Sequence, residues 1–175
     1  MEDICSKAME DIIGSLHPDF QLCCLKLYYD NKDLFDCCPG STHNHQAWPG
    51  GYIDHMSEIS LIAKTTYSSL LQIRAVPFSL HDALLALFFH DLEKPWKHDG
   101  IIKFSNEEGK ISFVLTKLKE YNIELNDDCC NAIKYSHGEG KDYRSDKRIQ
   151  TPLAAFVHCC DVISARIWFD QPNYQ

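Results

Sequence analysis

The chain has 175 residues, of which 45% are hydrophobic, and a formal net charge of −8 at pH 7. A chain of this length buries one sizeable core, so we expect one domain over residues 1–175. The acidic balance argues against an extensive nucleic-acid-binding surface, which needs clustered lysine and arginine side chains. It does not exclude a small anionic substrate, because a bound metal ion supplies positive charge locally.

The cysteines favour a reducing compartment. There are nine, and eight of them form four adjacent pairs, whose members bridge each other poorly. Residues 1–15 mix acidic with apolar residues, unlike a secretory signal, and no run reaches the ~18 apolar residues of a membrane helix. We expect a cytoplasmic protein, in the host cytoplasm if its source is viral, with cysteines packed as small apolar residues. A zinc site at Cys37 and Cys38 is the alternative, although the usual ligand spacing is missing.

The N-terminal half predicts three helices and a loop. Apolar residues recur four apart over residues 2–16, which indicates an amphipathic helix with a buried face of Ile4, Ala8, Ile12 and Leu16. Pro18 permits a second helix that continues through Tyr29. Residues 36–51 contain Pro-Gly turn sequences and predict a loop. A long helix is expected over residues 52–73, with an inward face of Ile59, Ile62, Ala63 and Leu70.

The C-terminal half predicts further helices. Ser79 with Asp82 resembles a capping box, so we expect a helix over residues 80–90, and its nearly wholly apolar sequence predicts a central position. Residues 94–110 are polar and predict an excursion over the surface, and the charged residues 138–148 predict an exposed loop. The remaining helices are expected over residues 111–121, 126–137 and 152–169. Because no segment alternates with period two, the expected fold is all-α, a compact single-domain helical bundle.

The most informative segment is LALFFHDLEKPW, an almost wholly apolar helix that ends in His90 and Asp91. Burying an imidazole and a carboxylate costs free energy unless both are compensated, and a metal ion compensates both at once. Adjacent residues on a regular helix point ~100° apart, so the pair can share one ion only where the helix ends or is distorted. Pro95 is consistent with a helix end at this point.

His55 and Asp161 are the candidates that complete the site. His55 stands early on the helix predicted for residues 52–73 and can face the end of the antiparallel helix that follows. Asp161 lies among apolar residues in FVHCCDVISA, where an acid needs a partner. Two imidazoles and two carboxylates suit Zn, Mn, Fe, Co, Ni or Mg, and they leave coordination positions for water and a phosphate oxygen.

The order His, then His-Asp, then a distant Asp resembles the HD-domain metal-dependent phosphohydrolases. Four segments carry the resemblance over most of the chain, in the family's order: HNHQAWPGGYIDHMSEI, FFHDLEKPW, AIKYSHGEG and HCCDVISA. The resemblance implies a helical bundle of the HD-domain type. It also implies a divalent metal ion, such as Zn, Mn, Co, Ni or Mg, held by His55, His90, Asp91 and Asp161.

The same resemblance assigns catalytic roles to Lys94 and His137. Lys94 matches a lysine that meets the substrate phosphate, and His137 matches a histidine that contacts the scissile phosphate or binds a second metal. A solvated lysine and a helix-terminal histidine are the simpler interpretations of these two residues. The chain departs from the family pattern at Gln46, which replaces the second of two paired histidines, and at Glu93, which stands where a glycine is usual.

Substrate binding is assigned to Trp48, Gly51, Lys141 and Arg144. Trp48 could stack on a nucleobase beside the metal, or it could anchor its loop on the core. Gly51 belongs to the same PGG sequence. Lys141 and Arg144 belong to a basic cluster in the loop after His137, which could receive a triphosphate or stay solvated.

These assignments predict a metal-dependent phosphoric ester or anhydride hydrolase that acts on a small-molecule nucleotide. The single-domain format resembles small phage and bacterial deoxynucleotide phosphohydrolases. This likeness implies a deoxynucleoside triphosphate triphosphohydrolase, for which dATP is one candidate substrate, or a 5′-deoxynucleotidase. The alternatives are a phosphodiesterase or 3′-to-5′ exonuclease, and a catalytically silent regulatory module. Apolar surface on the first two helices could support a homo-oligomer.

Overall fold

The structure is a computed structural model that describes residues 2–168, with side chains from residue 4 onward. Over these residues the fold is all-helical, as predicted, and contains no strand. The helices are α1 (Glu2–Gly14), α2 (Pro18–Asp30), α3 (Lys32–Cys37), α4 (Gly51–Ile73), α5 (Leu80–Phe89), α6 (Lys94–His98), α7 (Glu107–Glu120), α8 (Asp127–Lys134) and α9 (Pro152–Ile167), with a 3-10 turn η1 at Gly140–Asp142. None of the helices in this part of the chain is long and apolar enough to cross a membrane.

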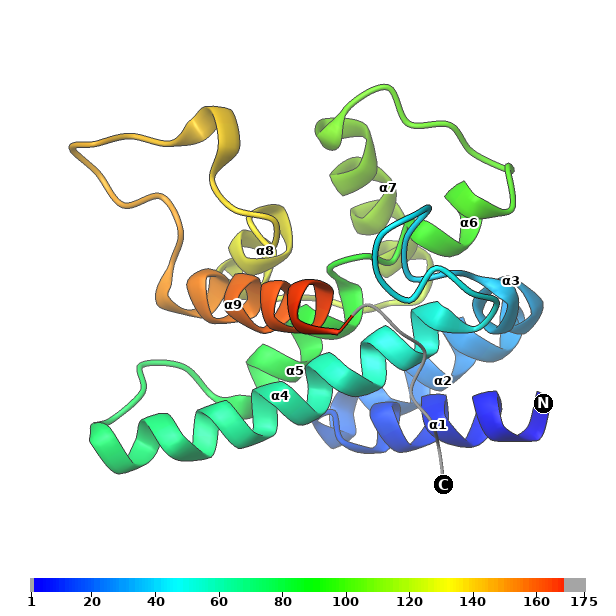
Figure 1. The fold of residues 1–175 in the computed structure, drawn as a ribbon, viewed down its shortest axis with the longest axis horizontal. Coiled ribbons are helices and arrows are strands. Elements are labelled where there is room, and N and C mark those ends of the chain that lie inside the picture. The colour runs from blue at the N-terminus through cyan, green and yellow to red at the C-terminus, as the bar shows by residue number, and fades with distance from the viewer. Residues whose placement is uncertain (1, 169–175) are drawn as a thin grey trace.

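Helix α4 packs against α1, α3, α5 and α9 (Figure 1). α1 lies along one side of it and α9 along another, while α5 contacts α4, α8 and α9. The loop between α8 and α9 projects away from the bundle. This arrangement brings together the N-terminal part of α4, the end of α5 and the middle of α9.

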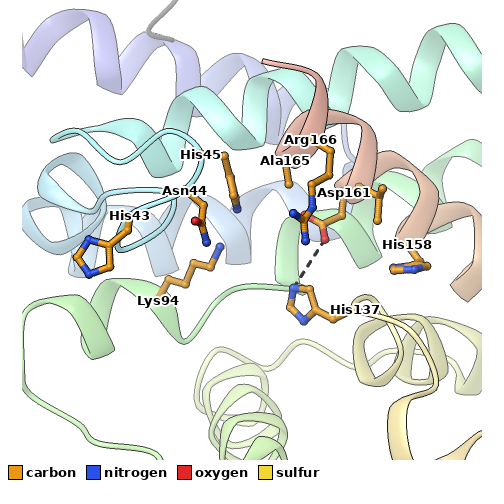
Figure 2. Close-up of a pocket in the computed structure, with 10 residues that line it drawn as sticks. His43, Asn44, His45, Lys94, His137, His158, Asp161, Ala165 and Arg166 are labelled. Carbon is orange, nitrogen blue, oxygen red and sulfur yellow. Dashed lines mark ion pairs between the residues drawn. The ribbon is translucent and has the colours of Figure 1, made fainter. Parts of the chain in front are cut away.

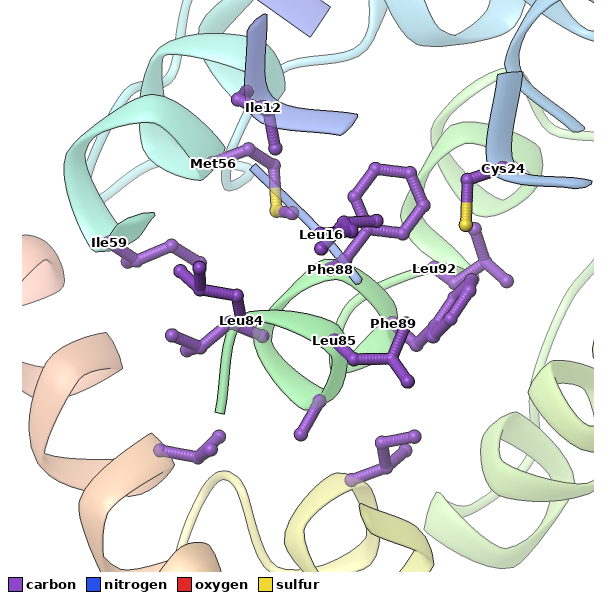
Figure 3. Close-up of a cluster of buried hydrophobic side chains, with 14 of the residues drawn as sticks. Ile12, Leu16, Cys24, Met56, Ile59, Leu84, Leu85, Phe88, Phe89 and Leu92 are labelled. Atoms are coloured by element: carbon purple, nitrogen blue, oxygen red, sulfur yellow. The ribbon is translucent and has the colours of Figure 1, made fainter. Parts of the chain in front are cut away.

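Helix α5 forms the centre of the core, as its apolar sequence predicted. All seven side chains from Ala83 to Phe89 are buried, and the Ser79 hydroxyl accepts a hydrogen bond from the backbone N–H of Asp82, which caps the helix. Figure 3 shows Leu84 beside Ile59 of α4 within this cluster of buried side chains. The helix is apolar all round because neighbouring helices cover each of its faces.

Helix α1 buries most of the predicted face, including Ile12 and Leu16, but Ile4 at its start lies outside it. Ile4 is 75% exposed, whereas the buried face consists of Met9, Ile12, Ile13 and Leu16. Residues four apart advance by ~40° more than a full turn at each step, so a stripe of three such steps rotates by ~120°. Spacings of three and four in alternation keep the face directed at α4.

Two segments that were not expected in the core contribute aromatic residues to it. Phe35 lies on the unpredicted helix α3 and is 1% exposed, and Trp96 is 5% exposed in the segment predicted to cross the surface. Their rings meet edge to face with centroids 5.9 Å apart. Helices α3 and α6 have six and five residues, too few for a periodic pattern to be recognised in the sequence.

The other helix ends lie within four residues of the predicted ones. α7 begins four residues before its predicted start, at Glu107, because Asn106 accepts a hydrogen bond from the backbone N–H of Gly109. α8 ends three residues before the predicted His137. α9 reaches Ile167, and the predicted end at Phe169 lies outside the described residues.

The nine cysteines are free thiols, and four of them are buried: Cys24, Cys38, Cys129 and Cys160. Cys38 donates a hydrogen bond to the carbonyl of Pro39 at 3.2 Å. In residues 2–168 neither Cys37 nor Cys38 belongs to a cluster of metal-ligating groups, so a cysteine zinc site gains no support.

Candidate metal centre

Four side chains from three elements converge beside the N-terminal part of α4. His55 lies on α4 and Asp161 on α9, while His90 and Asp91 follow directly on the end of α5. The ligand atoms that these residues offer all lie within 4.8 Å of one another. All four residues are buried, and Asp161, at 7%, is the most exposed.

The adjacent residues His90 and Asp91 face one point because α5 ends at Phe89. His90 keeps helical backbone angles, φ −61° and ψ −29°, and the chain then turns. His90 Nε2 lies 3.0 Å from Asp91 Oδ2. The other ring nitrogen of His90, Nδ1, donates a hydrogen bond to the Leu87 carbonyl at 2.7 Å, which leaves the lone pair of a neutral ring on Nε2.

The cluster contains buried polar atoms that need a cation. His55 Nε2 lies 3.3 Å from Asp161 Oδ1 and 3.9 Å from Asp91 Oδ2. The Nε2 atoms of His55 and His90 and both carboxylate oxygens of Asp91 are buried and make no hydrogen bond, although Asp91 Oδ2 forms an ion pair with Lys94. Because buried polar groups are nearly always hydrogen-bonded, four such atoms facing one another indicate a ligand set. Imidazole and carboxylate ligands fit a divalent metal ion.

The electrostatics favour ionised carboxylates. Burial opposes the ionisation of Asp91, but the charges of His90 and Lys94 hold the pKa of its carboxyl well below the usual range. Burial also opposes the ionisation of Asp161, but contacts with His55 and His90 lower its pKa. Burial lowers the pKa of His55 to about 4, so this ring is neutral at pH 7. Burial disfavours a charged His90, but both carboxylates raise its pKa to about 10, so a proton and a metal ion compete for it.

The comparison with protein families agrees with this geometry. The model of the HD domain matches residues 52–166, a span that contains all four residues of the cluster. The chain belongs to the HD-domain family. Membership implies a metal-dependent hydrolase, and the buried cluster is the part of this HD domain that could hold the divalent metal. No curated protein and no solved structure matches the chain.

A cavity of about 450 Å³ opens beside the metal-ligand cluster of the HD domain. Residues of the 38–50 loop, Lys94, the turn after α8 and the C-terminal half of α9 form its wall (Figure 2). Asp161 belongs to the wall, so the cavity reaches the cluster directly. Its volume lies in the range of small-molecule sites.

Lys94 lies on the cavity wall next to the cluster. Its Nζ is 2.5 Å from Asp91 Oδ2 and donates a hydrogen bond to the Gly40 carbonyl at 2.6 Å. Burial disfavours its charge, but Asp91 outweighs burial and raises the pKa of Lys94. The ammonium therefore provides a positive charge held in place between the 38–50 loop and the cluster.

His137 also lies on the cavity wall, in the turn that follows α8. Gly138 turns the chain there with a left-handed φ of +94°. His137 Nε2 lies 3.5 Å from Asp91 Oδ1 and 3.8 Å from Asp161 Oδ2. The hydrogen bond with Asp91 raises the pKa of His137, whose side chain is 52% exposed. His137 is not one of the four clustered residues, and a second metal ion near it stays a prediction.

Trp48 precedes the metal-ligand candidate His55 closely in the sequence, but it does not line the cavity. It is half-buried, and its indole N–H donates a hydrogen bond to Asp54 Oδ2 at 2.7 Å. This contact supports the interpretation of Trp48 as the anchor of its loop, and base stacking by Trp48 stays a prediction.

Lys141 and Arg144 are exposed and do not line this cavity. Lys141 Nζ lies 2.6 Å from Glu108 Oε1, and the Arg144 guanidinium lies 2.9 Å from Asp146 Oδ2. Both charged groups are therefore paired with acidic residues outside this cavity, and their role in substrate binding stays a prediction.

The cavity residues to which the sequence assigned no substrate contact include three histidines and one arginine: His43, His45, His158 and Arg166. His158 was expected to be structural, and its Nδ1 does donate a hydrogen bond to the Ser136 carbonyl at 2.7 Å. His158, Asp161 and Ala165 are spaced three and four apart on α9 and share one helical face. Residues three or four positions from Asp161 share its helical face, so this spacing could have identified the α9 side of the cavity from the sequence.

Gly51 does not line the cavity, but its lack of a side chain determines how the 38–50 loop packs. A Cβ at Gly51 would lie 1.9 Å from the carbonyl oxygen of Gln46. That oxygen also accepts a hydrogen bond from the backbone N–H of Gly40 at 2.9 Å. Gln46 has a left-handed φ of 43°. Its carbonyl group is held by the close approach to Gly51 and by the hydrogen bond from Gly40.

Gly51→Ala should therefore destabilise the protein, by ~1–3 kcal/mol, because a methyl group would force the 38–50 loop away from α4. The measurement is the free energy of unfolding from urea denaturation. Gly14→Ala is the matched control, since nothing lies within 4 Å of a Cβ there, and it should be neutral or stabilising by up to ~1 kcal/mol. Equal effects of the two substitutions would contradict the close approach at Gly51.

Proposed function

We propose that this HD domain hydrolyses a phosphate ester or anhydride bond of a nucleotide, with a deoxynucleoside triphosphate, dATP included, or a 5′-deoxynucleotide as the substrate. The supporting observation is the cavity that joins the metal-ligand cluster to three basic side chains, Lys94, His137 and Arg166. A cavity lined by basic groups attracts an anionic ligand even in a chain of net negative charge.

In this mechanism the chain's own residues bind phosphate and transfer a proton. A divalent metal ion held by His55, His90, Asp91 and Asp161 would supply Lewis acidity and lower the pKa of bound water toward ~7. Lys94 neutralises charge that develops on the phosphoryl oxygens. The oxygen of water forms the new bond to phosphorus as the bridging P–O bond breaks, and protonated His137 donates its proton to the leaving oxygen.

Arg166 is placed to bind the phosphates that do not react. It is exposed near the end of α9, and Figure 2 shows it with Asp161 among the residues that line the cavity. No ion pair within the described residues involves it. A guanidinium presents two parallel N–H groups to phosphate, so Arg166 suits a substrate with more than one phosphate group.

Arg166→Ala should lower kcat/KM for a nucleoside triphosphate by ~10–100-fold, which corresponds to the loss of ~1.5–3 kcal/mol from hydrogen bonds to a charged group. The loss should be smaller for the monophosphate, which makes fewer phosphate contacts. Arg144→Ala is the matched control, because this guanidinium pairs with Asp146 outside the cavity. A larger effect at Arg144 than at Arg166 would place the triphosphate on the projecting loop instead.

The reaction is tested by a phosphate-release screen with Mn, Co, Ni, Zn or Mg. The substrates are deoxy- and ribonucleoside mono- and triphosphates, a phosphate bis-ester and single-stranded RNA. We expect metal-dependent release from a deoxynucleotide. Cleavage of the diester or RNA without nucleotide turnover would replace the proposal by a phosphodiesterase or exonuclease. Release from no substrate with any of these metals would favour a catalytically silent regulatory module.

A further inference from the structure

A chain of hydrogen bonds runs from the ring of His55 to the 38–50 loop. His55 Nδ1 lies 3.0 Å from Ser164 Oγ, and the Ser164 hydroxyl donates a hydrogen bond to Glu58 Oε2 at 2.7 Å. The amide N–H of Gln46 donates to the same Glu58 oxygen at 2.6 Å. His45 Nδ1 in turn donates to Gln46 Oε1 at 2.6 Å. We call Ser164, Glu58 and Gln46 the His55 support.

The helical spacing explains why the His55 support lies behind the metal ligands. Glu58 follows His55 by three residues on α4, and Ser164 follows Asp161 by three residues on α9. Residues three apart share a helical face, so the packing of α4 against α9 aligns both pairs. Ser164 is 0% exposed and Gln46 is 2% exposed. Their polar groups are thus satisfied within the protein rather than by bulk solvent.

The direction of each hydrogen bond fixes where the His55 ring carries its hydrogen. An ionised carboxylate only accepts, so Glu58 receives hydrogens from the Ser164 hydroxyl and the Gln46 amide. The hydroxyl group of Ser164 donates its single hydrogen to Glu58, so its oxygen must accept the hydrogen bond from the ring of His55. Nδ1 therefore carries the hydrogen, and the lone pair is on Nε2, the atom that lies 3.3 Å from Asp161 Oδ1.

We propose that Ser164 is a positioning residue, which together with Glu58 and Gln46 holds His55 in the tautomer and orientation that a metal ion requires. Partners on the second nitrogen of a ligating histidine typically contribute roughly 10–100-fold to metal affinity. Gln46, whose backbone has a left-handed φ of 43°, is buried, and its side-chain amide donates to Glu58. The proposal rests on metal binding by the cluster and not on the identity of the nucleotide.

The first test measures Mn²⁺ affinity by isothermal titration calorimetry. Ser164→Ala should weaken binding by ~10–100-fold. Ser60→Ala is the control, because Ser60 is also a buried serine, on α4, and none of the hydrogen bonds described above involves it. Glu58→Ala should also weaken binding, and its effect should largely disappear in the Ser164→Ala background, because both act through one chain of hydrogen bonds. Additive losses would contradict the proposal.

The second test does not depend on whether a variant folds. Two-dimensional NMR of the wild-type protein, labelled with ¹⁵N-histidine and free of metal, should show His55 with hydrogen on Nδ1 and a lone pair on Nε2. A ring with hydrogen on Nε2, or equal Mn²⁺ affinity of the Ser164→Ala and Ser60→Ala proteins, would overturn the proposal. Weakened metal binding by Ser164→Ala in a protein that hydrolyses no nucleotide would uphold it while refuting the proposed reaction.

Discussion

Replacement of Asp91 by asparagine should abolish metal retention and reduce phosphate release by ~10³-fold or more, which corresponds to ~4 kcal/mol of transition-state stabilisation. Asp91 is fully buried, and its Oδ2 lies 3.0 Å from His90 Nε2. Asparagine has nearly the same shape and keeps one accepting oxygen. It lacks the negative charge that would balance a divalent cation, so the substitution tests charge rather than packing.

The substitution also leaves the Lys94 ammonium beside a neutral side chain. Removal of one partner from a buried ion pair typically costs ~3–5 kcal/mol, so the fold of the variant must be measured by circular dichroism alongside its activity. Asp146→Asn is the matched control, because its carboxylate pairs with exposed Arg144 away from the cavity. It should retain metal and activity. A folded Asp91→Asn protein that still binds metal and releases phosphate would refute the assigned metal centre.

The residues that the sequence identified most reliably are those that conflict with their surroundings. His90 and Asp91 end an apolar helix, and Asp161 interrupts the apolar stripe of α9. Burial of such groups is costly unless something compensates them, so their positions could be interpreted without knowledge of the fold. The structure brings these residues and His55 together, with ligand atoms within 4.8 Å of one another.

Trp48, Lys141 and Arg144 were assigned from composition and position in the chain, and their contacts depend on loop paths that no periodic pattern reveals. Each of the three contacts an acidic residue nearby in the fold, and none of them lines the cavity. Ser164 and Arg166 were missed for the opposite reason, since a serine and an arginine on a helix are individually unremarkable. Their roles follow only after the register of α9 is fixed by Asp161 and the packing of α4 and α9 is known.

Removal of the metal ion by chelation should lower the Tm of the protein by roughly 5–10 °C. A ligand at 100 times its Kd stabilises the native state by ~2.7 kcal/mol, and each kcal/mol shifts the Tm of a chain of this size by ~2–4 °C. The loss of stability arises at the cluster, because without metal the buried nitrogen and oxygen atoms of His55, His90 and Asp91 make no hydrogen bonds. The measurement is thermal unfolding with chelator and with excess Mn²⁺, Zn²⁺ or Ni²⁺.

The Asp91→Asn protein is the control for this measurement, and its Tm should not respond to metal, because the ion would lose one of its two buried carboxylate ligands. A metal-dependent shift of equal size in both proteins would place the ion on another part of the surface. Identical unfolding of the chelated and metal-loaded wild-type protein would mean that the four-residue cluster binds none of these ions. The proposed hydrolysis and the role of Ser164 would then fail together, since both require a metal ion between His55 and Asp91.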